Sequence, residues 1–107
     1  MHYQLWKKKI LVLGATGLLG TSLENVLKKD KNIKFIGCSH SDIDITNKVK
    51  LKKLLKSHRP NIIINTVAII GINYCEANPE KTMNINAFSV FYLSKLCKDL
   101  NIDLVQI

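Results

Sequence analysis

The sequence lacks the features that mark membrane and secreted proteins. No apolar run approaches the ~20 residues that a membrane span requires. The segment from Met1 to Lys9 ends in three lysines and has neither a long apolar stretch nor a small-residue cleavage site after it. We therefore expect a cytoplasmic protein with no membrane partner.

Cysteine and histidine are scarce. Cys38, Cys75 and Cys97 show no C-x-x-C spacing, and an odd number of cysteines in a reducing compartment argues against a disulfide framework. Buried thiols are the expected state for such residues. The three histidines lack the spacing of metal ligands, so no metal site is predicted.

Arginine and aromatic side chains are few, although the net charge is +8. Base reading favours arginine and single-strand binding favours stacked aromatics, whereas here one arginine accompanies fifteen scattered lysines. The lysines indicate solvated helix faces, and no specific nucleic-acid partner is predicted. Weak, sequence-blind attachment to nucleic acid remains an alternative. A mild attraction for an anionic cofactor is compatible with the charge.

The most informative segment that is present runs from Gly14 to Gly20, with the rhythm G-x-x-G-x-x-G. It follows the apolar run 10–13 and precedes the helical pattern 18–29. A strand, a glycine turn and a helix in that order form a cradle for a phosphate. The amino end of the helix offers unpaired N–H groups and partial positive charge, and glycine allows a close approach.

The remaining pattern predicts one α/β domain over 1–107, with 1–8 as a leading segment. Further strands are expected at 33–38, 42–45, 62–64 and 102–107, and helices at 47–57 and 78–100, with a helical turn near 74–77. Thr46 is expected to cap the helix at 47. Helical spacing predicts that the core face of the last helix carries Met83, Ala87, Val90 and Phe91. The fold class is a Rossmann-like doubly wound parallel sheet, truncated after about the fifth strand.

Several further motifs occur in a fixed order. They are Asp44-Ile45-Thr46, the segment 59–68, Glu76-Ala77-Asn78-Pro79-Glu80 and Asn84-Ile85-Asn86-Ala87. With the glycine turn, this order resembles the N-terminal half of extended short-chain dehydrogenases from about Lys8 to Ile107. Within that group the chain looks most like dTDP-4-dehydrorhamnose reductases and related sugar-nucleotide reductases.

The resemblance implies a role for each matching position. The glycine turn would hold the cofactor pyrophosphate, through Gly14, Thr16, Gly17, Leu18, Leu19 and Gly20. Asp44 and Ile45 match the pair that recognises and covers the adenine ring. The segment after the strand at 62–64 would line the cleft near the ribose, through Ala68, Ile69 and Ile70. Asn86 matches an asparagine that helps to order the active site.

Simpler interpretations stay open for three polar residues and one aromatic residue in this part of the chain. Asp44 could only help Thr46 to start a helix, and Asn65 could only bond the backbone of a tight loop. Asn86 could be a solvated helix residue, and Tyr92 is better explained by packing than by chemistry.

The cofactor is expected to be NADP(H) or NAD(H). Folds that prefer NAD carry an acid near the end of the second strand, where this chain has Cys38-Ser39-His40-Ser41, with Asp42 a little late. Lack of that acid permits a 2′-phosphate, which Ser39 and His40 could bond, so NADP(H) is favoured.

No complete catalytic site is expected in these residues. The family's chemistry implies a Ser or Thr after the fifth strand and a later Tyr-x-x-x-Lys, both beyond Ile107. Tyr3 and Lys7 have that spacing but lie before the first strand, so we treat the match as coincidence. The parent protein is expected to reduce a keto nucleotide sugar in making deoxysugars for surface polysaccharide, and a homodimer is compatible with this. The alternative is a non-catalytic dinucleotide-binding or regulatory subunit.

Overall fold

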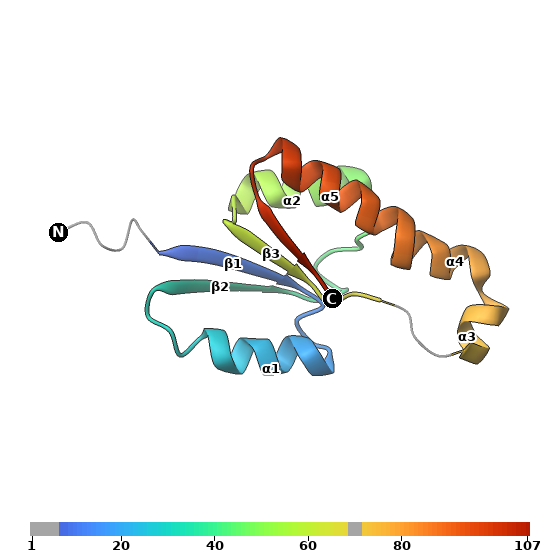
Figure 1. Ribbon diagram of the computed structural model, residues 1–107, viewed down its shortest axis with the longest axis horizontal. Coiled ribbons are helices and arrows are strands. Elements are labelled where there is room, and N and C mark those ends of the chain that lie inside the picture. The colour runs from blue at the N-terminus through green and yellow to red at the C-terminus, as the bar shows by residue number, and fades with distance from the viewer. Residues whose placement is uncertain (1–6, 69–71) are drawn as a thin grey trace.

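The sheet consists of four parallel strands in the order β2-β1-β3-β4 (Figure 1). A computed structural model describes residues 7–68 and 72–107 of the chain. The strands are β1 (Lys8–Leu13), β2 (Ile33–Cys38), β3 (Ile62–Asn65) and β4 (Asp103–Gln106). Leu13 pairs with Cys38 on one side and with Asn65 on the other, so β1, β2 and β3 end level with one another.

Helices cover both faces of this sheet, which confirms the doubly wound class. Helix α1 (Leu18–Leu27) lies on one face, and α2 (Lys48–His58) and α5 (Ser89–Asp99) lie on the other (Figure 1). The chain leaves β1 towards β2 through α1 and returns past β1 to β3 through α2. The switch point is therefore at the carboxyl ends of β1 and β3, where ligands of such sheets bind.

The segment between β3 and α5 is helical for most of its length. It contains α3 (Ile72–Ala77), α4 (Pro79–Met83) and the π-helical turn η2 (Asn84–Phe88), which leads directly into α5. The helix predicted over 78–100 is thus one path with a π turn inside it. A proline in the first position and Glu80 in the first turn explain why α4 begins where the sequence predicts.

The core lies mainly between the sheet and the helices α2 and α5. Leu11, Leu13 and Ile63 of the sheet are completely buried, as are Leu51 and Leu55 of α2. Strands buried on both faces need such continuous apolar runs. Among the described residues, no helix is both long enough and apolar enough to cross a membrane.

Two of the three cysteines occupy this core, as predicted, whereas Cys75 is only half-buried. Cys38 ends β2 and Cys97 lies on α5, and both are buried thiols. Burial raises the pKa of Cys38, helped by the nearby Asp42 charge, and burial raises the pKa of Cys97 to about 11. Both thiols are therefore protonated and unreactive near neutral pH.

The strand predicted at 42–45 is wrong, so the sheet has four strands rather than five. The segment forms turns in which the N–H groups of Asp42 and Ile43 donate to the Ser39 carbonyl at 3.0 and 3.1 Å. Ile43 and Ile45 are buried while Asp44 is exposed. The alternation that suggested a strand comes from two isoleucines packing into the core, without a neighbouring backbone to pair with.

The helix cap predicted at Thr46 is also wrong. Helix α2 begins at Lys48, and its cap is Asn47, whose side-chain oxygen accepts the Lys50 N–H at 3.1 Å. Thr46 instead donates to Asp44. Both residue types cap helices, so composition alone does not choose between adjacent positions.

The predicted core face of the last helix is wrong as well. Met83 and Phe91 are 52% and 65% exposed, Ala87 is exposed, and only Val90 is half-buried. The buried side of α5 carries Ser89, Leu93, Leu96 and Cys97. The π turn contains more residues per turn than an α-helix. Positions counted from Met83 at α-helical spacing therefore fall on the exposed side of α5. Tyr92 packs against the core, as expected.

Candidate dinucleotide site

Gly14 begins a tight turn at the end of β1. Its φ of +84° lies in the region that glycine adopts without strain. The N–H groups of Gly14 and Ala15 donate to the Cys38 carbonyl at 2.9 and 3.1 Å, which fixes the turn to the end of β2. Across the turn, the Thr66 hydroxyl donates to the Leu13 carbonyl at 2.7 Å. A Cβ on Gly14 would collide with that hydroxyl oxygen.

Gly20 allows α1 to pack directly on this turn. It is the buried residue of α1, and a Cβ there would overlap the Gly14 carbonyl oxygen and lie 2.8 Å from Ala15 Cα. These atoms belong to the backbone, which does not yield as a flexible side chain does. The glycine therefore determines how closely the amino end of α1 approaches the end of β1.

Gly17 is the residue before α1, and no side chain caps this helix. Its own N–H donates to the Gly14 carbonyl at 3.1 Å. In the part of the chain that the structure describes, no backbone carbonyl accepts the N–H groups of Leu18 and Leu19. Leu18 is 92% exposed, so these N–H groups lie at an open helix end that suits an anion.

A cavity of about 290 Å³ lies beside the turn, at the carboxyl ends of β1 and β2. Five predicted site residues line it together: Gly14, Ser39, His40, Asp44 and Ile45. They come from two segments, the turn after β1 and the loop after β2, which meet because the paired parallel strands β1 and β2 end at one edge of the sheet. The other lining residues are Leu13, Ile43, Val67, Lys81 and Ile85.

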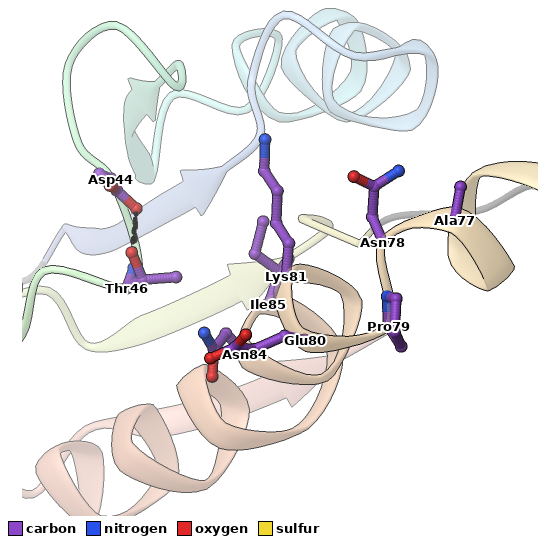
Figure 2. Close-up of a pocket in the computed structure, with 9 residues that line it drawn as sticks. All are labelled: Asp44, Thr46, Ala77, Asn78, Pro79, Glu80, Lys81, Asn84 and Ile85. Carbon is purple, nitrogen blue, oxygen red and sulfur yellow. Dashed lines mark hydrogen bonds between the residues drawn. The ribbon is translucent and has the colours of Figure 1, made fainter.

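A larger recess of about 540 Å³ adjoins this cavity (Figure 2). It separates Asp44 and Thr46 from α3, α4 and η2, and it shares Asp44, Lys81 and Ile85 with the smaller cavity. The two spaces together run from the glycine turn past Asp44.

Asp44 is held in one orientation by Thr46. Its carboxylate accepts the Thr46 N–H at 2.9 Å and the Thr46 hydroxyl at 2.7 Å. These bonds lower the pKa of Asp44, and the charges of Lys81 and Lys50 lower it further. Because Asn47 rather than Thr46 caps α2, the contact with Thr46 does not start that helix, as the simpler interpretation of Asp44 required. The place of Asp44 on both cavities is compatible with the adenine role.

Asp42 forms a similar arrangement at the end of β2. Its carboxylate accepts the Ser39 N–H at 2.8 Å and the Ser39 hydroxyl at 3.1 Å, and these bonds lower the pKa of Asp42. In the sequence, Asp42 comes four residues after the last residue of β2. The turn at 39–43 reverses the chain, so the Asp42 side chain lies next to Ser39 at the end of the strand. An ionised carboxylate therefore stands beside Ser39.

Several predicted residues lie elsewhere. Thr16, Gly17, Leu18 and Leu19 surround the open end of α1 and do not line either cavity. Ala68 and Asn86 are exposed and also line neither. The predictions for Ile69 and Ile70, and for Tyr3 in the Tyr3–Lys7 motif, fall outside the described residues.

Asn65 bonds the backbone of the tight loop after β3, as its simpler interpretation predicts. It is completely buried, its side-chain oxygen accepts the Val67 N–H at 3.0 Å, and its amide group donates to the Gln106 side chain at 2.9 Å. These bonds fix the exit of the chain from β3 and join β3 to β4.

Sequence reasoning missed Lys81 and Ile85 as lining residues. They are four positions apart and so lie on one side of the helical path. That spacing shows a shared face, but only the packing of α4 and η2 over the end of the sheet shows what the face meets. Within the described residues, no group of three or more metal-binding side chains is present.

The model of the RmlD substrate binding domain family matches residues 8–107. The chain belongs to this family. Among curated members, it is 31% identical over 87 residues to the dTDP-4-dehydrorhamnose reductase of Aggregatibacter actinomycetemcomitans. That match covers 81% of this chain and 30% of the relative. The chain therefore spans about a third of the length of such RmlD-family members.

Two solved structures have the same fold over most of this chain. A dTDP-4-dehydrorhamnose reductase from Clostridium acetobutylicum superposes with a TM-score of 0.86 at 33% identity, over 92% of this chain and 35% of that one. The enzyme of the same name from Bacillus anthracis, solved in complex with NADP, also has a TM-score of 0.86, at 23% identity and the same coverage. The second likeness is one of fold.

Proposed function

We propose that this chain is the dinucleotide-binding portion of a reductase that acts on a keto nucleotide sugar such as dTDP-4-dehydrorhamnose. The observation that carries the proposal is the joining of an uncapped helix end, a glycine turn that excludes side chains, and an adjoining cavity. The helix end and the glycine turn together suit a pyrophosphate, and the adjoining cavity suits the adenosine half of a dinucleotide. The RmlD-family relatives named above support the substrate class.

The fit to a dinucleotide rests on two features of the turn. Gly14 and Gly20 have no room for a Cβ, so the turn cannot be filled by its own side chains. The N–H groups of Leu18 and Leu19 point from a helix end whose partial positive charge favours a pyrophosphate.

The neighbouring residues would hold the other half of the nucleotide. Ile45 and Ile43 offer an apolar wall of the cavity, and Asp44 offers an ionised acceptor for the amino group of adenine. NADP(H) or NAD(H), when bound, supplies the hydride for carbonyl reduction. The chain's own contribution is to fix the position of that cofactor.

Catalysis by this segment alone is not expected. Reduction of a carbonyl needs an acid for the oxygen, which a tyrosine paired with a lysine supplies in the resembling family. Tyr74 and Tyr92 are the tyrosines in the described residues, and neither is followed by a lysine at the fourth position. We propose a cytoplasmic setting and binding without turnover for the chain alone.

Calorimetric titration with NADPH and NADH tests the proposal. The wild-type chain should bind at least one of them, and Gly17→Ala should weaken binding. Its added methyl would stand 3.4 Å from the Gly14 carbonyl oxygen, an ordinary contact, so the fold should persist while the cradle is crowded. Absence of binding by a folded wild-type chain would refute the proposal.

A further inference from the structure

Lys81 contributes a positive charge to the 290 Å³ cavity beside the glycine turn. Figure 2 shows its side chain extending from α4 towards the segment that follows β1. It lines the 290 Å³ cavity together with Gly14, Ser39 and His40. Among the residues that line this cavity, it is the only lysine or arginine in the described part of the chain.

Ser39 is less available than its position suggests. Both its N–H and its hydroxyl donate to the Asp42 carboxylate, at 2.8 and 3.1 Å. A phosphate that approached Ser39 would compete with an ionised acid for the same two donors. The turn at the end of β2 is thus unfavourable to a phosphate unless another group supplies positive charge.

Lys81 is placed to supply that charge. It lines the same cavity from a different element, α4, and its charge already stabilises the carboxylate of Asp44. A lysine on a flexible stem recognises a phosphate as a point charge, without a fixed geometry.

We propose that Lys81 recognises the 2′-phosphate of NADP(H), and that Asp42 opposes it. The inference rests on the proposed dinucleotide site. The sequence predicts that Ser39 and His40 distinguish NADPH from NADH. In this proposal, two opposite charges on different elements, Lys81 and Asp42, distinguish them instead. Lys81 is a specificity-determining residue in this account.

The test measures affinity rather than turnover. NADPH, NADH and adenosine 2′,5′-bisphosphate are titrated calorimetrically into the wild-type chain, Lys81→Met and Asp42→Asn. Lys98→Met is the matched control, because it removes one lysine charge from the last turn of α5. Circular dichroism verifies that all four proteins have the same helix content.

Lys81→Met should weaken NADPH and the bisphosphate about tenfold, the size of a lost hydrogen bond to a charged group, and leave NADH within about twofold. Asp42→Asn should strengthen NADPH relative to NADH, and Lys98→Met should change neither by more than about twofold. Higher salt should shrink the effect of Lys81→Met on NADPH.

Other outcomes overturn the inference in distinguishable ways. Equal weakening of NADPH and NADH by Lys81→Met would place Lys81 on the shared pyrophosphate. No change in either affinity would show that Lys81 remains in solvent. Failure of the folded wild-type chain to bind any of the three ligands would refute the dinucleotide site, and the inference with it.

Discussion

Gly20→Ala is expected to destabilise the protein, although alanine is the better helix former. The new Cβ would overlap the Gly14 carbonyl oxygen and lie 2.8 Å from Ala15 Cα, so α1 must move away from the turn. Forcing atoms into a packed site costs typically ~1–3 kcal/mol, and collision with backbone favours the upper end. Helix propensity returns about 1 kcal/mol. The net loss is about 2 kcal/mol in the free energy of unfolding.

Thermal and urea denaturation followed by circular dichroism measure this loss. For a domain of about this size, 2 kcal/mol corresponds to a fall in Tm of roughly 8–16 °C. Gly17→Ala is the matched control, because its Cβ would make only a 3.4 Å contact and the φ of Gly17 is −74°. The free energy of unfolding of the Gly17→Ala control should fall by less than ~1 kcal/mol. A Gly20→Ala protein as stable as the wild type would show that α1 does not pack on the turn.

Three further predictions concern stability, pH and reactivity. Arg59 ends α2 with a φ of 46°, so Arg59→Gly should raise the free energy of unfolding by about 0.5–1 kcal/mol in urea denaturation, and a loss would contradict the left-handed cap. The pKa of Asp44 is lowered in the folded state, so its bonds to Thr46 stabilise the fold above the ordinary pKa of 3.8 and are lost as pH falls through the lowered value. Asp44→Asn should therefore flatten the acid limb of the stability curve, and an unchanged limb would refute this. Cys97, with its pKa of about 11, should resist iodoacetamide at pH 8 until urea unfolds the chain, as peptide mapping would show; rapid labelling of the native protein would contradict its burial.

The glycine turn and the central strands could be predicted from sequence because their causes are local. The apolar run 10–13 is typical of a central buried strand, and Leu11, Val12 and Leu13 of β1 are completely buried. Three glycines at this spacing between a strand and a helix admit few backbone paths. The meeting of Gly14 and Ser39 at one cavity then follows from the pairing of the parallel strands β1 and β2.

The features that sequence could not supply depend on contacts between distant segments. Ile43 and Ile45 alternate like a strand, yet they form none because no neighbouring backbone is available. Lys81 is one of fifteen lysines, and only the packing of α4 over the sheet edge distinguishes it. Asp42 reaches Ser39 because a turn reverses the chain after β2.

Amide chemical-shift mapping of the ¹⁵N-labelled chain during titration with NADPH tests the central claim most directly. If the pyrophosphate binds the open end of α1, the largest shifts will be those of Leu18 and Leu19, with smaller shifts at Ser39 and Asp44. Saturating NADPH that leaves the amides of Leu18 and Leu19 unmoved, or that moves only distant residues, would contradict the account.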